Sequence, residues 1–324
     1  LINDWCHSTI YRINEGRKEK RMSYIEWIVE ESGARLDKYL SEVSELSRTR
    51  VQDLAKEKKI FVNGKTEKSS YKVQCGDTIS CDVPENEELN VQAEDIPLDI
   101  LYEDDDIIVI NKPKGMVVHP APGNYSGTLV NALLYHCKDL SGINGVIRPG
   151  IVHRIDKDTT GCIVACKNDL AHNAIAKQLE TKQCHREYIA LVDGNIANEA
   201  GVIDAPIGRD RRDRQKMTVT PTNSKDARTH FKVKERFQHY TLLDCSLETG
   251  RTHQIRVHMK YINHPVTGDE KYGRKCAMMD TQGQCLHAYQ LTLVHPSTHQ
   301  KMTFTAPLPQ YFETLLEKLR REDI

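Results

Sequence analysis

Apolar residues first recur at helical spacing in two runs, Leu36–Val43 and Val51–Ala55. Spacings of three and four positions place such residues on one face of a helix, where they can pack on a core. A short strand pattern, Ile60–Val62, follows and ends at Asn63-Gly64, which is a strong signal for a hairpin turn. The pattern predicts a compact helix-helix-hairpin module over residues 33–83.

Beyond residue 100, short apolar runs alternate with helical patterns. A continuous apolar run is typical of a strand buried on both faces, whereas an alternating run has one face toward a core. Runs of both kinds predict strands at 107–110, 163–165, 188–192, 229–233, 240–247 and 286–294. We expect helices at 129–135 and after Asn168, a suitable N-cap. This order predicts an α+β fold with a mixed sheet rather than a doubly wound parallel sheet.

Composition divides the chain into four parts. Residues 1–32 lack a clear period and include a basic run, so we expect a leader or disordered arm, with Met22 as a hypothetical start. Residues 33–83 form the small module and residues 100–324 the larger domain. The segment 84–99 is acidic with few apolar anchors, which predicts a linker that lets the two parts move relative to one another.

The charge of the chain is unevenly distributed, although the total is only −1 with a pI near 7.0. Residues 35–72 hold ten Lys or Arg against six Asp or Glu, and residues 208–236 hold ten against four. Residues 77–106 hold twelve acidic residues and no Lys or Arg. Affinity for nucleic acid depends on local patches, so two basic faces remain compatible with an RNA partner, although any single run can also be a solvated surface.

Cysteine usage and hydropathy indicate a cytoplasmic protein. The ten cysteines show no C-x-x-C spacing of a zinc or redox site, and reduced thiols are the simplest interpretation. No apolar run approaches the roughly 18 residues needed to span a bilayer. No G-x-S-x-G elbow accompanies the histidines, which argues against a hydrolase, and His253 and His258 are spaced to face different sides of a helix rather than to share a metal.

One loop carries the candidate chemistry. His153-Arg154-Ile155-Asp156 is followed by turn-forming residues up to Gly161 and then by an apolar strand pattern. An ionised carboxylate in such a loop can act as a nucleophile where water is restricted. An Asp in a strand-loop-strand segment can equally serve its own turn by accepting hydrogen bonds from backbone amides. The loop alone leaves both interpretations of Asp156 open.

Four further segments match one family in the same order as this loop. With it they cover residues 100–312, and they lie at 111–120, 188–194, 249–269 and 286–296. On these motifs the chain resembles the RluA-type family of RNA pseudouridine synthases. The resemblance implies a long, bent, mostly antiparallel sheet crossed by a catalytic cleft. It also implies isomerisation of uridine to pseudouridine, a reaction without redox change or hydrolysis that requires no cofactor and no metal.

The resemblance also assigns roles within the candidate site. Asp156 is the expected catalytic carboxylate, which attacks the anomeric carbon, attacks ring carbon 6 or starts an elimination to a glycal. Arg256 is implied as its ion-pair partner, because a planar guanidinium holds a carboxylate in fixed geometry. Tyr188 is implied as a late general base or proton relay. Arg154 is a candidate wedge for a flipped base or a partner of Asp158, and Arg251 a phosphate contact or a loop brace.

The module at 33–83 resembles the alpha-L RNA-binding module shared with a ribosomal small-subunit protein. Its expected RNA-binding residues are Arg35, Arg48, Arg50 and Lys65. Lys58 stands where that module usually has Gly, at a helix end that favours the left-handed conformation. A module of this kind favours ribosomal RNA of the large subunit over transfer RNA as the partner. We expect the enzyme to be a monomer. The alternative is a non-catalytic RNA-binding or ribosome-assembly factor that keeps the same fold.

Overall fold

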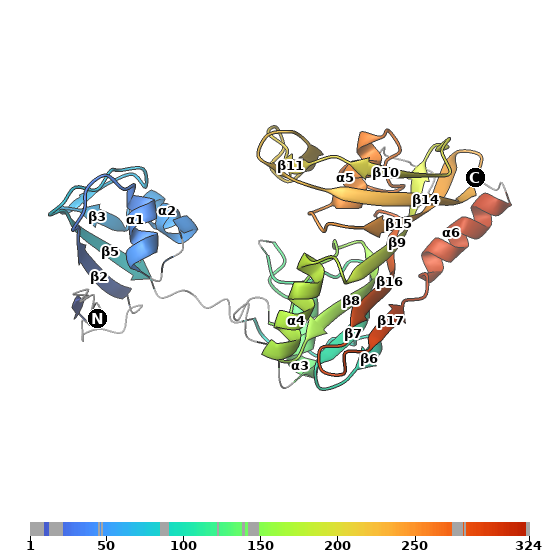
Figure 1. Ribbon diagram of the computed structural model, residues 1–324, viewed down its shortest axis with the longest axis horizontal. Helices are drawn as coiled ribbons and strands as arrows, with labels where there is room; N and C mark the ends of the chain where they lie inside the picture. Colours follow the sequence, from blue (N-terminus) through green and yellow to red (C-terminus); the bar gives the residue numbers. More distant parts are fainter. Residues whose placement is uncertain are drawn as a thin grey trace. The chain divides into compact units, whose positions relative to one another are not determined.

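The computed structural model divides into two compact units, Leu1–Leu89 and Asn90–Ile324 (Figure 1). The structure describes residues 10–12, 22–44, 46, 48–84, 91–121, 123–137, 140–141, 149–273, 281 and 283–321.

The first unit packs two helices on one antiparallel sheet of order β1-β2-β5-β3-β4. Its helices are α1 (Leu36–Val43) and α2 (Arg48–Lys56), and its strands are β1 (Ile10–Arg12), β2 (Met22–Ile28), β3 (Ile60–Val62), β4 (Lys65–Thr66) and β5 (Thr78–Pro84). The apolar face of α1 buries Leu36 and Leu40 against Val51 and Leu54 of α2 and Ile79 of β5. The helix-helix-hairpin order predicted for this module is therefore present.

Strand β2 corrects the predicted start of this module. All seven residues of β2 pair with β5, from Met22 opposite Pro84 to Ile28 opposite Thr78. Trp27 and Val29 are buried in the same core as the helices. Residues 22–32 therefore belong to the folded unit, whereas we expected a leader or arm as far as residue 32. The expectation was wrong because the polar and apolar residues of β2 follow no clear pattern in the sequence. The strand becomes evident only from its pairing with β5 in the structure.

Two backbone positions agree with the sequence in this unit. Asn63 and Gly64 have φ values of +50° and +76° and form the β3–β4 turn, as a two-residue hairpin turn requires. Lys58 has a φ of +58° after α2. Lys58 therefore takes the left-handed conformation that glycine usually supplies, at a cost of about 1 kcal/mol relative to glycine.

The second unit is built on a nine-stranded sheet of order β10-β14-β15-β9-β16-β8-β7-β6, with β17 also paired to β16. A small sheet, β12-β11-β13, lies beside α5 (Figure 1). The strands are β6 (Ile100–Glu103), β7 (Ile107–Lys112), β8 (Thr160–Cys166), β9 (His185–Asp193), β10 (Ala200–Asp204), β11 (Ile207–Arg209), β12 (Met217–Val219), β13 (Ser224–Lys225), β14 (Arg228–Arg236), β15 (Tyr240–Leu247), β16 (Leu286–Val294) and β17 (Lys301–Thr305). Within this large sheet β16 and β8 are parallel, and the other recorded pairs are antiparallel. The mixed, mostly antiparallel α+β architecture is confirmed.

Helices cover this sheet on both faces at β7 and β8, near its β6 edge. They are α3 (Leu129–His136) and α4 (Asp169–Glu180), joined elsewhere by α5 (Gln254–Tyr261) and α6 (Gln310–Arg320). Ile108 and Ile110 of β7 pack in one core with α3, whereas Ile107 and Val109 pack in another with α4. The expected cap of α4 is present, because the Asn168 side chain accepts a hydrogen bond from the Ala171 amide. The continuous apolar run of β7 thus serves two layers.

The predicted linker is shorter than expected. Val91 is buried in the core of the second unit, and Ile96 and Leu98 pack against that core. The Glu94 amide donates to the Asn131 carbonyl, and the Glu94 carboxylate accepts from the Gly127 amide. Residues 91–99 therefore belong to the second unit rather than to a linker over 84–99. The acidic composition was misleading because its few apolar residues are the ones that pack.

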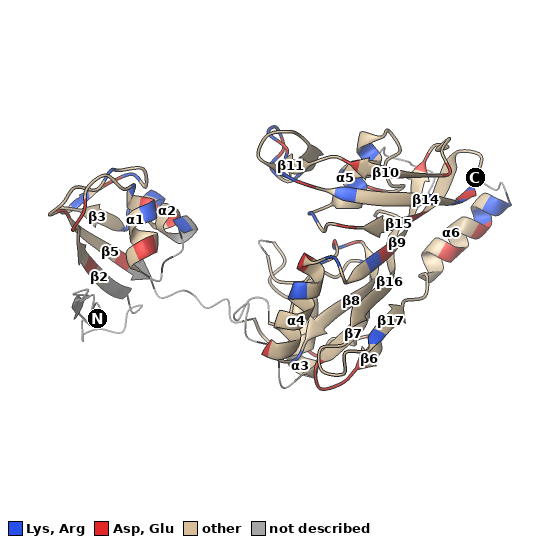
Figure 2. Ribbon diagram, in the orientation of Figure 1, with Lys and Arg blue, Asp and Glu red and all other residues tan. Residues whose placement is uncertain are grey.

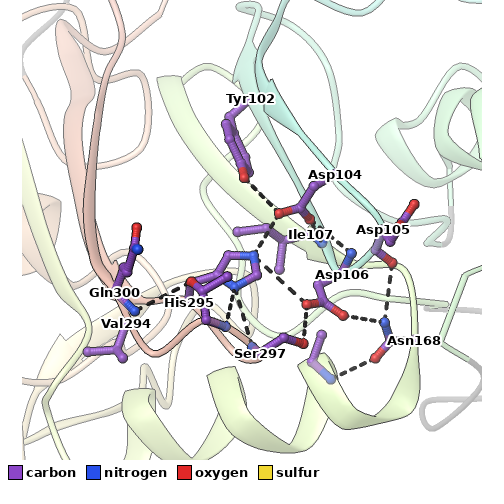
Figure 3. Close-up of polar contacts among 12 residues, drawn as sticks. Tyr102, Asp104, Asp105, Asp106, Ile107, Asn168, Val294, His295, Ser297 and Gln300 are labelled. Atoms are coloured by element: carbon purple, nitrogen blue, oxygen red, sulfur yellow. Dashed lines mark hydrogen bonds and ion pairs between the residues drawn. The ribbon is translucent and has the colours of Figure 1, made fainter.

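A polar network joins the β6–β7 turn to the β16–β17 turn and the start of α4 (Figure 3). His295 Nδ1 accepts from the Thr298 amide, so its proton lies on Nε2, which donates to Asp104 Oδ2 at 2.7 Å. Ser297 and Asn168 both donate to Asp106. These bonds fix three connections at one end of the sheet.

No helix in the described part of the chain is long and apolar enough to cross a membrane.

Candidate active site

The loop that carries Asp156 is held rigidly against two neighbouring strands. Ile155 is buried beneath it, and the Thr159 amide donates to the Asp156 carbonyl in a turn. Gly161 has a φ of +108°, and a Cβ added there would overlap the Ala288 backbone of β16. Glycine is therefore required at this position, because β16 approaches the loop too closely for any side chain. The close approach fixes the end of the loop.

Lys112 supports the same loop from below. Its side chain is fully buried, and Nζ donates to the carbonyls of Pro113, Met116 and Lys157 at 2.8, 2.8 and 3.0 Å. Burial lowers the pKa of Lys112 to about 7, against the opposing attraction of Asp158 and Asp156. Three carbonyls match the three protons of an ammonium group. Lys112 thus ties the 112–116 turn to the residue next to Asp156.

Arg256 of α5 holds Asp156 from the opposite side. Its Nη1 lies 2.8 Å from Asp156 Oδ2, while Nε and Nη2 bind the two oxygens of the buried Asp269 at 2.6 and 2.8 Å. Burial opposes the charge of Arg256, but Asp269 and Asp156 outweigh it and raise the pKa of Arg256. The guanidinium stays charged and is fixed in direction, so the predicted pairing of Arg256 with Asp156 is present in the structure.

His253 and Tyr272 extend this group and were not singled out as site residues from the sequence. The Met217 amide donates to the Tyr272 hydroxyl, which lies 2.7 Å from His253 Nδ1. The other ring nitrogen of His253, Nε2, lies 3.9 Å from Asp156 Oδ1. Burial lowers the pKa of His253, opposed by Asp156. His253 thus places Nε2 toward the second oxygen of Asp156.

Tyr188 lies on β9 opposite Cys245 and is buried, with one side facing the same pocket as Asp156. The pocket has a volume of about 80 Å³. Burial raises the pKa of Tyr188, so its hydroxyl keeps its proton near neutral pH. No hydrogen bond joins this hydroxyl to another described residue. A proton-bearing group thus faces the space above the carboxylate.

Arg154 and Arg251 line the same pocket. Arg154 is exposed and forms no ion pair with Asp158 in the described structure, so the alternative of a loop salt bridge is not observed. Arg251 donates from Nε to the Asp226 carbonyl at 2.8 Å, and its amide donates to Gln254. Arg251 therefore braces its loop and leaves its terminal nitrogens to the pocket. The five predicted residues of the large domain come together at one site.

The residues predicted for the small module lie in the other unit. Arg35 and Arg48 both pair with the buried Asp37, at 2.9 and 3.4 Å, and Lys65 is exposed on β4. The Arg35 hydrogen bond is the main cause that holds the pKa of Asp37 far below its usual range. The side chain of Arg50 lies outside the described residues. Basic residues of this unit are concentrated on α2 rather than on α1, which holds one Lys against two acidic residues (Figure 2).

One group outside the pocket has donor atoms spaced for a metal ion. Glu103, His136 and Cys137 bring three such atoms within 4.8 Å of one another. The Glu103 carboxylate is already bound by His136 at 2.8 Å and by the Lys167 ammonium at 3.0 Å. The positive charge of Lys167 on the Glu103 carboxylate disfavours a metal ion at this group. None of the three residues lines the Asp156 pocket.

Comparisons with known proteins identify the family of the chain. The RNA pseudouridylate synthase family matches residues 106–261, and the S4 domain matches residues 34–79. An uncharacterised RNA pseudouridine synthase of Bacillus subtilis is 55% identical over 90% of this chain and 96% of its own length. A ribosomal large subunit pseudouridine synthase D of Nitrosomonas europaea is 45% identical over 89% and 85%. The solved structure titled human RNA pseudouridylate synthase domain containing 4 covers 68% of this chain and 92% of its own, with 26% identity and a TM-score of 0.54.

The chain therefore belongs to the RluA-type RNA pseudouridine synthases and carries an S4 domain before its catalytic unit. It is an RNA-modifying enzyme, which rules against the non-catalytic factor considered from the sequence.

Proposed function

We propose that this enzyme converts uridines of large-subunit ribosomal RNA to pseudouridine with Asp156 as the catalytic carboxylate. The observation that supports this role is the position of Asp156 between Arg256 and His253, with Tyr188 in the same pocket. A guanidinium that is itself fixed holds the paired carboxylate in a defined orientation. Large-subunit RNA is favoured because several relatives carry that substrate in their names.

The reaction breaks the bond between ribose carbon 1 and uracil nitrogen 1 and makes a bond from the same carbon to uracil carbon 5. The proton on carbon 5 leaves and nitrogen 1 gains one, so no electron or phosphate is transferred. Asp156 can begin the reaction by attack on the anomeric carbon, by attack on ring carbon 6 or by elimination. Each route needs an ionised carboxylate in a pocket that excludes most water.

Tyr188 is suited to the proton steps at the base. Its hydroxyl is protonated and has no protein partner within the described residues, so it can contact the uracil ring or a bound water. A phenol placed there can pass the carbon 5 proton away once the new bond has formed. We propose this relay role for Tyr188, and a role for Arg154 as the group that replaces the flipped base in its stack.

Binding of the RNA is assigned to basic surfaces in both units. The hairpin between β11 and β12 carries Arg209, Arg211, Arg212 and Arg214 around an open cavity of about 770 Å³ (Figure 2). The S4 domain adds Arg35, Arg48, Arg50 and Lys65. Phosphate contacts of this kind supply affinity without reading the sequence. The local basic patches thus reconcile an RNA partner with a chain of net charge −1.

The test is Asp156→Asn, with Asp158→Asn in the same loop as its matched control. We expect the first variant to lose pseudouridine formation while RNA affinity is kept or improved, because a carboxylate near phosphates is removed. The control should keep activity, since Asp158 does not line the pocket. Mapping of pseudouridine in ribosomal RNA from cells with and without the gene tests the substrate. Near-normal product from the Asp156 variant would refute the assignment.

A further inference from the structure

Arg186 is a cation beside the active site that pairs with none of the described residues. It lies on β9 two residues before Tyr188, so both side chains project from the same face of the strand. Within the described part of the chain no carboxylate pairs with Arg186, and its buried Nε has no hydrogen-bond acceptor. Buried guanidinium groups are usually paired, because an unmet donor costs free energy. Among the described residues, Arg186 Nε is therefore a donor with an unmet need for an acceptor.

His153 adds a second unmet donor close to it. His153 Nε2 accepts a hydrogen bond from the Val164 amide at 3.0 Å, so the ring proton lies on Nδ1. This Nδ1 is buried and has no partner among the described residues. Burial, with Arg186 nearby, lowers the pKa of His153 to about 3, so the ring is neutral and its donor is permanent. Arg186 Nε and His153 Nδ1, which come from different segments, thus both lack a hydrogen-bond acceptor among the described residues.

Both groups line a cavity that adjoins the catalytic pocket. This neighbouring cavity has a volume of about 470 Å³, and Arg154, Arg186 and Gly250 line it together with the Asp156 pocket. Its one lining carboxylate, Glu180, is exposed and paired with Lys177 at 2.8 Å. The cavity is therefore predominantly a donor site, with two arginines and a neutral histidine around it.

Gly250 allows the guanidinium to lie between the two cavities. A Cβ added to Gly250 would come within 2.5 Å of Arg186 Nη1. The backbone at Gly250 is outside the left-handed region, so alanine is compatible with its conformation. Replacing Gly250 by alanine should therefore displace the tip of Arg186 without straining the chain.

We propose that Arg186 and His153 form a subsite for a phosphodiester of the RNA backbone, adjacent to the uridine held over Asp156. A guanidinium fork binds two phosphate oxygens at once, and a neutral imidazole N–H can donate to a third. The narrow pocket suits the reacting nucleoside, whereas the wider cavity suits the charged link to its neighbour. The subsite deepens the proposed function, on which it rests, by fixing the target nucleotide through its phosphate.

The experiment measures RNA binding in Asp156→Asn protein, so that binding is separated from turnover. Probes are an unmodified large-subunit ribosomal RNA transcript and a nine-residue oligouridylate, the latter also with uncharged methylphosphonate links. We expect Arg186→Gln to weaken binding of both charged probes roughly tenfold and to reduce the slope of log affinity against log salt by about 0.7. Gly250→Ala, which keeps the charge, should fall between this variant and wild type. Lys301→Gln removes an exposed charge from β17 and should change neither probe's affinity by more than about twofold.

Two comparisons make the result decisive. The uncharged oligomer should bind Arg186→Gln and its parent equally, and inorganic phosphate should compete with RNA less well in the variant. An affinity and salt slope for Arg186→Gln that match those of Lys301→Gln would overturn the subsite, as would equal competition by phosphate. Failure of the proposed function is separate, because it would appear as absence of pseudouridine with the wild-type residue at 156 while the Arg186 effect on binding persisted. Melting temperatures within about 2 °C of the parent exclude unfolding as the cause.

Discussion

Arg256 binds Asp156 through one nitrogen and Asp269 through the other two. The bond to Asp269 is the bidentate one and lies deeper, since Asp269 is almost fully buried. Asp269 thus sets the direction of the guanidinium, and the single remaining nitrogen sets the position of the Asp156 carboxylate.

This arrangement predicts different defects for two conservative changes. Arg256→Lys keeps a charge but has no fork, so it cannot hold both carboxylates, and we expect kcat to fall roughly 100-fold or more. Asp269→Asn keeps the shape but weakens the hold on Arg256, and kcat should fall by a smaller factor, about tenfold. Single-turnover rates with saturating enzyme measure both. Equal activity of Arg256→Lys and wild type would contradict the role of the fork.

Tyr188→Phe should separate binding from the proton step. The ring still fills its place in the core, so stability should change by about 1 kcal/mol or less, because only a hydroxyl with no protein partner is lost. Pseudouridine formation should drop by 100-fold or more if the hydroxyl moves a proton. Product is counted by mass spectrometry of digested RNA, with urea unfolding as the check on stability. A variant that turns over at the normal rate would remove Tyr188 from the mechanism.

Lys112→Met should destabilise the second unit, with a defined pH dependence. The change leaves three buried carbonyls without a donor, which costs about 2 kcal/mol or more. Because the folded pKa of Lys112 is about 7, below its ordinary value of 10.5, the unfolded chain binds more protons above pH 7. Wild-type stability relative to the variant should therefore rise above pH 7 by up to about 1.4 kcal/mol per unit and be flat below it. Urea unfolding at pH 6, 7, 8 and 9 measures the difference, and a flat or falling difference above pH 7 would count against it.

Two deletions test where the second unit begins. A protein that lacks residues 1–89 should stay folded and keep Asp156 in place, but bind RNA more weakly and with a shallower salt dependence. A protein that lacks residues 1–99 should melt at a lower temperature, because Val91, Ile96 and Leu98 no longer cover the core. Calorimetry of the pair measures this difference. The same melting temperature for both would mean that residues 91–99 contribute no stability.

The sequence predicted what depends on neighbours along the chain. The Asn168 cap, the Asn63-Gly64 turn and six strands of the large sheet need only local periodicity and turn chemistry, and they are present. The other three strands, β6, β10 and β17, were not predicted. The clustering of Asp156, Tyr188 and Arg256 needed more, since these residues lie on three separate elements. Only the resemblance to a family brought them together before the structure was known.

What the sequence did not predict depends on partners far along the chain. From the sequence, Lys112 is expected to be an exposed lysine. Its buried position depends on acceptors such as the carbonyl of Lys157, 45 residues further along the chain. Tyr272 acquires a role only through His253, and Asp269 only through Arg256. Strand β2 needs β5 beside it. Buried polar groups of this kind are satisfied by tertiary contacts, so spacing in the sequence carries no signal for them.

The position of β16 has a consequence for the order in which the enzyme becomes active during its synthesis. β16 lies between β8, which follows the Asp156 loop, and β9, which carries Tyr188. It is nevertheless translated long after both. Without Leu286–Val294, no strand would join β8, which follows the Asp156 loop, to β9, which carries Tyr188. We therefore expect the two residues to reach their places in one sheet only after β16 has been synthesised.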